Sequence, residues 1–130
     1  MEIVLQSLLE GAKRASGTVV VIDVFRAFTT AAYAFNQGAK ELILVAGVEE
    51  ALRLRRNGMV HLCMGEVNGE KPEGFDFGNS PFAIAKENLE GKVIAQSTTA
   101  GTVGVDAANN ADVIFLGSLV TATATINAIR

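Results

Sequence analysis

The chain has 130 residues, 49% of them hydrophobic, and its 14 acidic and 11 basic side chains give a formal net charge of −3. A chain of this length fits a single domain with a sizeable core, and its one cysteine, Cys63, excludes an internal disulfide. The slight acidic excess, without a basic patch, argues against a nucleic-acid partner, and no apolar run is long enough for a signal peptide or a membrane span, so we expect a cytoplasmic protein.

The first forty residues predict a strand, a connection, a second strand and a helix. Residues 1–9 alternate loosely, as an edge strand does, and residues 10–17 are small and polar, as in a connection. Residues 18–23 form a continuous β-branched run, which is typical of a strand buried on both faces in a parallel sheet. Residues 26–36 carry apolar side chains at helical spacing, and Gly38 follows as a C-cap.

The remainder of the chain continues this alternation of strands and helices. Such alternation is typical of right-handed βαβ units on an open, mostly parallel sheet with helices on both faces. We therefore predict a single three-layer α/β/α domain over residues 1–130. The further predicted strands cover residues 41–46, 59–64, 92–96 and 112–116, and the further helices cover residues 48–56, 81–88, 102–109 and 119–129.

A glycine-rich stretch, GEVNGEKPEGFDFGNSP, runs from Gly65 to Pro81 without helical or strand periodicity. Loops of this length inside a small domain are uncommon and often carry function. Asn79 and Ser80, directly before Pro81, offer the cap and first turn of a helix. The stretch also fits a plain surface excursion rich in turn residues, but the rest of the chain favours the functional interpretation.

Polar side chains follow the ends of the predicted strands. Asp23 ends the first buried strand and Arg26 starts the helix after it. Glu66 stands just beyond the third strand, and Asp76 lies later in the same loop. In an open α/β sheet, ligands bind beyond the carboxyl ends of the strands. The ends of the last two strands add Ser97, Thr98, Thr99, Gly101, Gly117 and Ser118 to this edge.

Each of these residues also has a purely structural explanation. Asp23 is a good helix N-cap, Arg26 fits an ordinary surface charge, and Thr29 and Thr30 can bond to backbone carbonyls within their helix. The turn at residues 97–102 fits a capping motif, and it lacks the lysine of a Walker A loop. A turn of glycine and hydroxyl residues at a helix N-terminus is nevertheless a favourable anion site.

A convergence of Asp23, Glu66 and Asp76 beside Arg26 would suit a divalent cation together with a phosphate group. Magnesium takes oxygen ligands and commonly uses one or two carboxylates plus substrate oxygens, and it can neutralise phosphate charge and activate water. An arginine can hold a phosphate or sulfonate through two parallel hydrogen bonds. The pattern favours a phosphatase or another anion-binding site, with Mg²⁺ as the expected cofactor.

Six segments of the chain resemble the 2-phosphosulfolactate phosphatase family and occur in the family's order and spacing. GFDFGNSP together with IDVFRA is the specific part of this signature. The resemblance implies an α/β enzyme of coenzyme M biosynthesis, or a relative of one: a magnesium-dependent acid phosphatase that converts 2-phosphosulfolactate into sulfolactate and inorganic phosphate. The segments are VVVIDVFRAFTTA (19–31), GAKELILVAGVEEAL (38–52), MGE (64–66), GFDFGNSP (74–81), STTAGT (97–102) and GSLVTATA (117–124).

The resemblance also implies roles for individual residues. The carboxylates of Asp23, Glu66 and Asp76 would bind magnesium or serve in acid–base catalysis. Arg26 would bind the anionic substrate, a small phosphoester, and the threonine turn would contact phosphate oxygens. The residues expected to line the substrate pocket are Asn79, Ser80, Thr98, Thr99, Gly101 and Thr102, with Ser118 as a further phosphate-binding candidate.

Three positions depart from the family pattern, and the family's members are longer. Val67 stands where an arginine is expected, and Ala100 and Thr121 replace asparagines. One missing donor in a preorganised site can lower the rate by about 10²–10³. The departures favour an alternative, a shortened and catalytically weak or inactive homologue that acts as an anion-binding or oligomeric module. A chain that needs a partner to supply a second half is a further alternative.

The short sheet also bears on self-association. Its open strand edges are of the kind that proteins commonly cover with a partner. We therefore predict a homo-oligomer, with a dimer as the favoured form.

Overall fold

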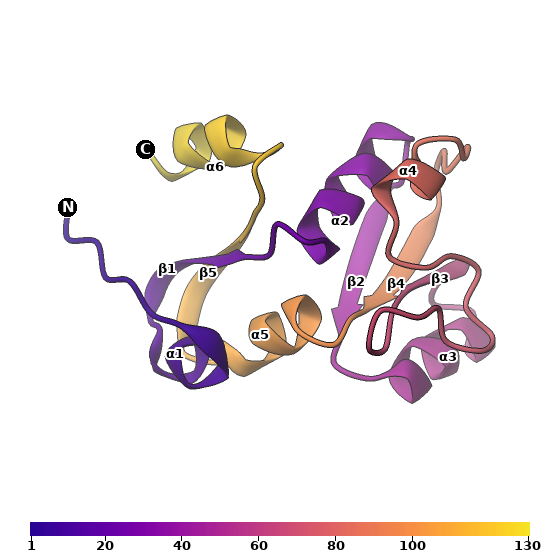
Figure 1. Ribbon diagram of the computed structural model, residues 1–130, viewed down its shortest axis with the longest axis horizontal. Helices are drawn as coiled ribbons and strands as arrows, with labels where there is room; N and C mark the ends of the chain where they lie inside the picture. The colour runs from indigo at the N-terminus through magenta and orange to yellow at the C-terminus, as the bar shows by residue number, and fades with distance from the viewer.

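The computed structural model describes the whole chain and contains six helices and five strands (Figure 1). All strand pairs are parallel and neither sheet closes, which confirms the predicted open α/β class. The strands lie in two sheets instead of one. In the first, β1 (Gly17–Ile22) pairs with β5 (Ala111–Gly117); in the second, β4 (Val93–Ser97) lies between β2 (Glu41–Val45) and β3 (Leu62–Gly65). The helices are α1 (Leu8–Arg14), α2 (Ala27–Asn36), α3 (Val48–Arg56), α4 (Pro81–Ile84), α5 (Gly101–Ala107) and α6 (Ala122–Ile129).

The first nine residues form no strand, so the edge strand predicted there is wrong. Instead, α1 begins at Leu8, and much of the predicted connection is helical. Glu10 lies in its first turn and Lys13 in its last, and Lys13 Nζ is 2.7 Å from Glu10 Oε1. This order of charges suits the helix dipole, and the i,i+3 pair supports a helix over a strand.

The hydrophobic core surrounds the sheet of β2, β4 and β3, which has helices on both faces. On one face, Met64 and Ile94 pack with Ala34 of α2. On the other face, Ala95 packs with Ala51 of α3. This sheet therefore has the three layers that the sequence predicts.

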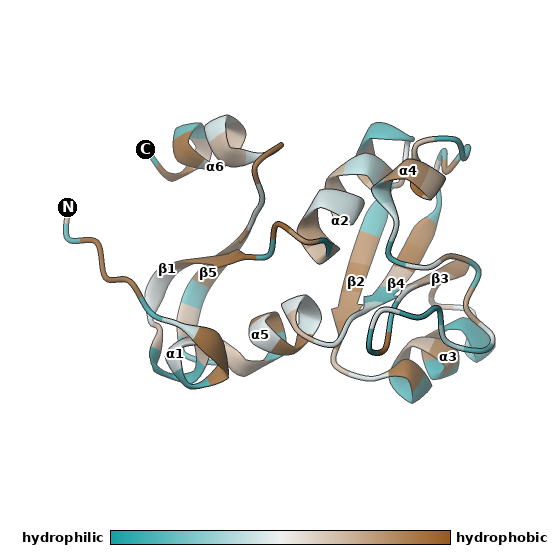
Figure 2. Cartoon of the chain, in the orientation of Figure 1, coloured by the Kyte–Doolittle hydropathy of each residue, from teal (hydrophilic) through white to brown (hydrophobic).

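The sheet of β1 and β5 has no such core. None of the buried apolar residues of the chain comes from either strand, although the β-branched run in β1 predicts a strand buried on both faces. The side chains are as apolar as expected, and Figure 2 shows a strongly hydrophobic stretch along β1. The strand prediction is correct, but its predicted burial is not, because too little of the chain packs against this sheet to bury it.

Backbone hydrogen bonds hold the stretch from Gly65 to Pro81 in place, so it is not a loose excursion. At its start, Gly65 N donates to Phe77 O at 3.1 Å, which ties the beginning of the stretch to its later part. A tight turn follows in which Val67 N donates to Glu70 O at 2.9 Å. The glycine-rich sequence therefore builds a defined loop at the carboxyl end of β3.

The helix after this loop begins as predicted and ends early. Ser80 Oγ accepts a hydrogen bond from Ala83 N at 3.2 Å and so caps α4. Pro81 takes the first helical position, where a missing N–H leaves no bond unmade. The helix ends at Ile84, four residues before the predicted end. No helix in the chain combines the length and hydrophobicity that crossing a membrane requires.

Candidate active site

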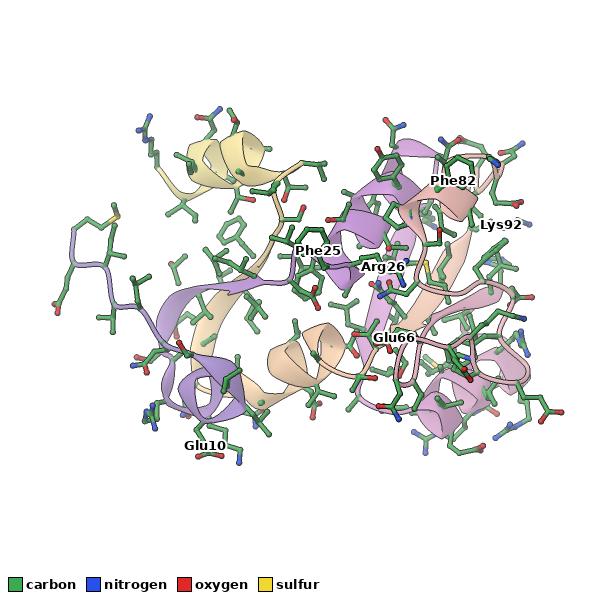
Figure 3. The ribbon with its side chains drawn as sticks, viewed as in Figure 1. Glu10, Phe25, Arg26, Glu66, Phe82 and Lys92 are labelled. Carbon is green, nitrogen blue, oxygen red and sulfur yellow. The ribbon has the colours of Figure 1, made fainter.

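Four of the predicted site residues come together where the two sheets meet. Asp23 and Arg26 follow β1 of one sheet, while Glu66 follows β3 and Thr99 follows β4 of the other. The negative charge of Glu66 acts on Asp23, the positive charge of Arg26 acts on Glu66, and Glu66 is hydrogen-bonded to Thr99. Figure 3 shows Arg26 beside the start of α2, with Glu66 below it in this view. The strand ends thus form one polar site although they belong to two sheets.

Glu66 is fixed in place through both of its carboxylate oxygens. Oε1 accepts a hydrogen bond from Thr99 N at 2.7 Å, and Oε2 accepts bonds from Thr99 Oγ1 at 3.0 Å and Gly69 N at 2.7 Å. Burial acts to raise the pKa of Glu66, but these hydrogen bonds and the charge of Arg26 together hold the pKa below its ordinary value. Glu66 is therefore a charged carboxylate at neutral pH.

The hydrogen bond to Gly69 depends on the sequence of the tight turn that follows Glu66. Asn68 and Gly69 have positive φ angles of 52° and 87°, a conformation that asparagine and glycine adopt more readily than other residues. Asn68 N donates to Thr99 Oγ1 at 2.9 Å. One threonine side chain therefore joins both Glu66 and the turn after it to the end of β4.

The surroundings of Asp23 shift its pKa in the opposite direction from that of Glu66. Burial raises the pKa of its carboxyl above the ordinary value, the backbone N–H of Ala27 lowers it in part, and the nearby negative charge of Glu66 raises it further. Perturbed carboxylates of this kind are frequent in functional sites, although structural networks produce them as well. The pair of Asp23 and Glu66 leaves a local excess of negative charge that a cation would relieve.

The start of α5 approaches Asp23 so closely that a side chain would not fit there. A Cβ atom on Gly101 would lie 2.7 Å from Asp23 Oδ2 and 2.7 Å from Ala27 Cβ. Gly101 thus contributes to the site because it has no side chain, and its place in the substrate pocket stays a prediction.

The threonine turn between β4 and α5 uses most of its hydroxyl groups internally. Thr98 and Thr102 are buried, Thr98 N donates to Thr102 Oγ1 at 2.8 Å, and Thr102 N donates to Thr98 Oγ1 at 3.1 Å. This is the capping arrangement that the sequence left open as an alternative. Of the turn's threonines, only Thr99 is exposed, and its hydroxyl serves Glu66.

The structure does not bring Asp76 into this group. Asp76 Oδ2 accepts hydrogen bonds from Arg55 at 2.7 Å and from Cys63 N at 2.8 Å, and Arg55 also donates to Gly74 O at 2.7 Å. No three His, Cys, Asp or Glu side chains lie close enough together to hold a metal ion, so the expected convergence of three carboxylates is absent. The reason is that Arg55, on α3, pairs with the carboxylate of Asp76 on its own side of the loop.

Two buried amide side chains have oxygen atoms without a hydrogen-bond partner. Asn79 is 8% exposed and Gln96 is fully buried, and neither Asn79 Oδ1 nor Gln96 Oε1 accepts a hydrogen bond. Gln96 Nε2 donates to Ala27 O at 2.8 Å, which connects β4 to the start of α2. Asn79 is among the predicted site residues and Gln96 is not, because the only signal of Gln96 is a polar residue inside the apolar run of β4.

Ser118 belongs to a separate turn after β5. Ser118 N donates to Thr121 Oγ1 at 3.0 Å, and the two hydroxyl oxygens are 3.1 Å apart. Asp23 N donates to Gly117 O, directly before this turn, at 3.0 Å, so the turn lies beside Asp23, although none of its side chains is hydrogen-bonded to Glu66. Thr121, one of the three departures from the family pattern, therefore closes the turn in which Ser118 lies.

A hollow of about 220 Å³ lies at the carboxyl ends of β2, β3 and β4, next to Glu66. Its wall is part polar and part apolar, and it contains Val67, which stands where the family pattern has an arginine. The hollow carries no basic side chain, and Arg26 is the cation whose charge lowers the pKa of Glu66. Its lining residues are Ala46, Gly47, Val48, Glu66, Val67, Ser97, Thr98, Thr99 and Val103.

The profile of the 2-phosphosulpholactate phosphatase family matches residues 4–130. The chain belongs to the 2-phosphosulfolactate phosphatase family. Similar relatives include a probable 2-phosphosulfolactate phosphatase of Thermotoga petrophila, which is 44% identical over 97 residues, and one of Caldicellulosiruptor saccharolyticus, which is 43% identical over 106 residues. A third, of Bacillus subtilis, is 42% identical over 97 residues.

The region matched by this chain is less than half of the length of each relative. The match covers 75% of this chain and 42% of the Thermotoga petrophila and Bacillus subtilis phosphatases, and 82% of this chain and 44% of the Caldicellulosiruptor saccharolyticus phosphatase. Among the segments of the family signature that form the site are IDVFRA, which contains Asp23 and Arg26, and the threonine turn that leads to Gly101. GFDFGNSP contributes Asn79 to the core and Asp76 to the ion pair with Arg55.

Proposed function

We propose that this chain forms part of the active site of a magnesium-dependent phosphatase that hydrolyses 2-phosphosulfolactate, or a similar small acidic phosphoester, to the alcohol and inorganic phosphate. The observation that carries the proposal is an unpaired cation next to two carboxylates. Arg26 is exposed and takes part in none of the chain's ion pairs, yet it lies within electrostatic reach of Glu66. A cytoplasmic location and a role in coenzyme M biosynthesis belong to the same proposal.

The free guanidinium group of Arg26 suits a doubly charged anion. A guanidinium can donate two parallel hydrogen bonds to a phosphate or sulfonate, and it keeps its charge at every physiological pH. Asp23, three residues earlier, would repel the same anion unless a cation lay between them. The alternation of charges in this site therefore favours an anionic ligand that binds together with a metal ion.

The residues present fit a magnesium ion held mainly by Asp23. A carboxylate offers about four lone-pair positions, and hydrogen bonds from Thr99 and Gly69 occupy three of those on Glu66. Glu66 thus has about one position left, whereas Asp23 keeps most of its own. Magnesium commonly binds through one or two carboxylates and completes its shell with water and substrate oxygens. When bound, it would neutralise phosphate charge and acidify a water molecule.

Isothermal titration with inorganic phosphate and with sulfolactate, each with and without Mg²⁺, tests the proposal. Arg26→Gln is expected to weaken binding of both anions about tenfold or more, since a hydrogen bond to a charged group contributes roughly 1.5–3 kcal/mol. Arg56→Gln, at an exposed arginine of α3, is the matched control and is expected to bind as the unaltered chain does. Equal affinity in both variants would contradict the assignment of Arg26.

A catalytically weak or inactive homologue is the second candidate, and the replacement of an arginine by Val67 at the hollow favours it. Release of phosphate from 2-phosphosulfolactate separates the two functions. Magnesium-dependent release that Asp23→Asn abolishes would establish the enzyme. Anion binding without release would establish a binding module, and the absence of both at millimolar ligand would refute each of them for this chain alone.

A further inference from the structure

The two faces of the β1–β5 sheet are covered unequally. Register pairs Val20 with Phe115 and Ile22 with Gly117, and paired residues of parallel strands share a face. A Cβ atom on Gly117 would lie 2.9 Å from Val20 Cγ1, which confirms that these residues lie on one face. Val21 therefore points to the opposite face, where its Cγ1 would lie 3.4 Å from a Cβ on Gly104 of α5. Helix α5 covers the Val21 face only.

The face opposite α5 is largely apolar and partly exposed. We call it the bare face, and it consists of Thr18, Val20, Ile22, Val113 and Phe115, of which Val20 and Phe115 are half-buried. Ile22 is 69% exposed and Val113 is 48% exposed, whereas strands of parallel sheets are normally covered on both sides.

The segments around the bare face are equally uncovered. Helix α6 contains no buried residue, and Leu119 and Val120, in the turn before it, are 75% and 58% exposed. The outer edges of β1 and β5 are also unpaired, because each strand pairs only with the other. A two-stranded sheet is not stable on its own in water, so this part of the fold lacks a layer of polypeptide.

We propose that the bare face and the free strand edges bind a polypeptide equivalent to the part of the family's chain that this sequence does not match. The relatives provide the argument for this occupant, since more than half of each lies outside the match. Each of these relatives thus contains enough further chain to supply the missing layer. This polypeptide adds strands beside β1 or β5 and packs apolar side chains against Ile22 and Val113.

The proposal can be tested on this chain alone by hydrogen–deuterium exchange. Amides of β1 and β5 are expected to exchange at least about tenfold faster than those of β4, because burial and packing set the free energy of local opening. Equal protection of the two sheets in a monomer would overturn the proposal, since the bare face would then need no covering. A dimer that protects β1 and β5 would also overturn it, because the occupant would then be a second copy.

Co-expression tests the occupant itself. The tagged chain is co-expressed with the unmatched part of the Thermotoga petrophila phosphatase, and the purified complex is measured by light scattering and by hydrogen exchange. A one-to-one complex with slowed exchange in β1 and β5 is expected. A complex whose exchange slows only elsewhere would contradict the proposal.

Two matched variants locate the contact. Ile22→Glu places a charge on the bare face at a residue that is 69% exposed, and Phe82→Glu does the same on α4 at a residue that is 73% exposed. Ile22→Glu is expected to weaken the complex about tenfold or more, as loss of a central apolar contact does, and Phe82→Glu is expected to leave it unchanged. Equal effects would overturn the assignment. These readouts need no phosphatase activity, so they stand apart from the proposed function.

Discussion

Thr99 binds both carboxylate oxygens of Glu66, with its N–H 2.7 Å from Oε1 and its hydroxyl 3.0 Å from Oε2. The same hydroxyl accepts a hydrogen bond from Asn68 N. This single residue therefore sets the position of the loop after β3 relative to the turn after β4. Its exposure also makes it accessible to mutation without disturbing the core.

We predict that Thr99→Val lowers the free energy of unfolding by about 1 kcal/mol, because it removes the hydroxyl that serves Glu66 and Asn68 while keeping the shape of the side chain. Urea unfolding measures the change. Thr99→Ser keeps the hydroxyl and should restore most of the stability, and Thr123→Val on α6 controls for the substitution itself. A Ser variant as unstable as the Val variant would speak against the hydrogen bonds as the cause.

We predict that Asp23→Asn raises the melting temperature at pH 7. Because burial and Glu66 raise the pKa of Asp23 in the folded state, its contribution to stability is fully present below the ordinary value of 3.8 and is lost as the pH rises through the higher folded value. The charged form therefore costs stability at neutral pH, and the amide removes this cost. Thermal unfolding at several pH values should show the difference between variant and parent shrinking towards pH 3.

Asp112→Asn, at an exposed residue of β5, is the control for the pH series. An Asp23→Asn variant that is less stable than its parent at pH 7 would show that the carboxylate is favourably held. Loss of Mg²⁺-dependent anion binding together with a gain in stability is the expected combination, because a functional site commonly keeps a charge that the fold alone would not.

Asp76→Asn should lower stability and leave ligand binding almost intact. The carboxylate joins Arg55 to the backbone of Cys63, so its loss is expected to cost about 1–2 kcal/mol in urea unfolding. Phosphate affinity in the presence of Mg²⁺ should change less than about twofold, with Glu73→Gln in the same loop as the control. A fall of tenfold or more in affinity would instead support the role of metal ligand that the family resemblance implies.

Gly101→Ala is predicted to destabilise the fold and to weaken anion binding, because the added methyl group would overlap Asp23 and Ala27. Overpacking of this kind costs roughly 1–3 kcal/mol. Gly104→Ala in the same helix meets only Val21 Cγ1, at 3.4 Å, and should change stability little, since alanine also favours the helix. Similar losses at both positions would mean that helix geometry, and not the approach to Asp23, decides the effect.

The sequence predicted the elements of this fold well because their signals are local. The β-branched run of β1 and the Asn79-Ser80-Pro81 start of α4 each lie within a few residues of the structure that they encode. Strand pairing is not local, so one sheet was predicted where two exist. The prediction of an N-terminal strand is wrong because it rests on a loose alternation of apolar residues, which is a weak signal. The charge order of Glu10 and Lys13 favours the helix that the structure contains.

The candidate site was predictable to the extent that it follows strand ends. Asp23, Arg26, Glu66 and Thr99 could be placed from the rule that polar residues gather there. Asp76 has the same local signal, but its partner Arg55 is 21 residues away in the chain, and no pattern within the loop reveals that ion pair. Gln96 was missed for the converse reason, since a single polar residue in a buried strand has several explanations.

The division of the strands between two sheets gives the site an additional property. Asp23 is attached to the sheet that lacks a core, and Glu66 to the sheet that has one. A ligand that contacts both residues links the two sheets, and because it binds only their folded arrangement, its binding stabilises that arrangement, including the sheet without a core. Ligand binding at this site therefore also requires correct folding, because only a chain whose two sheets are correctly positioned relative to each other can bind the ligand.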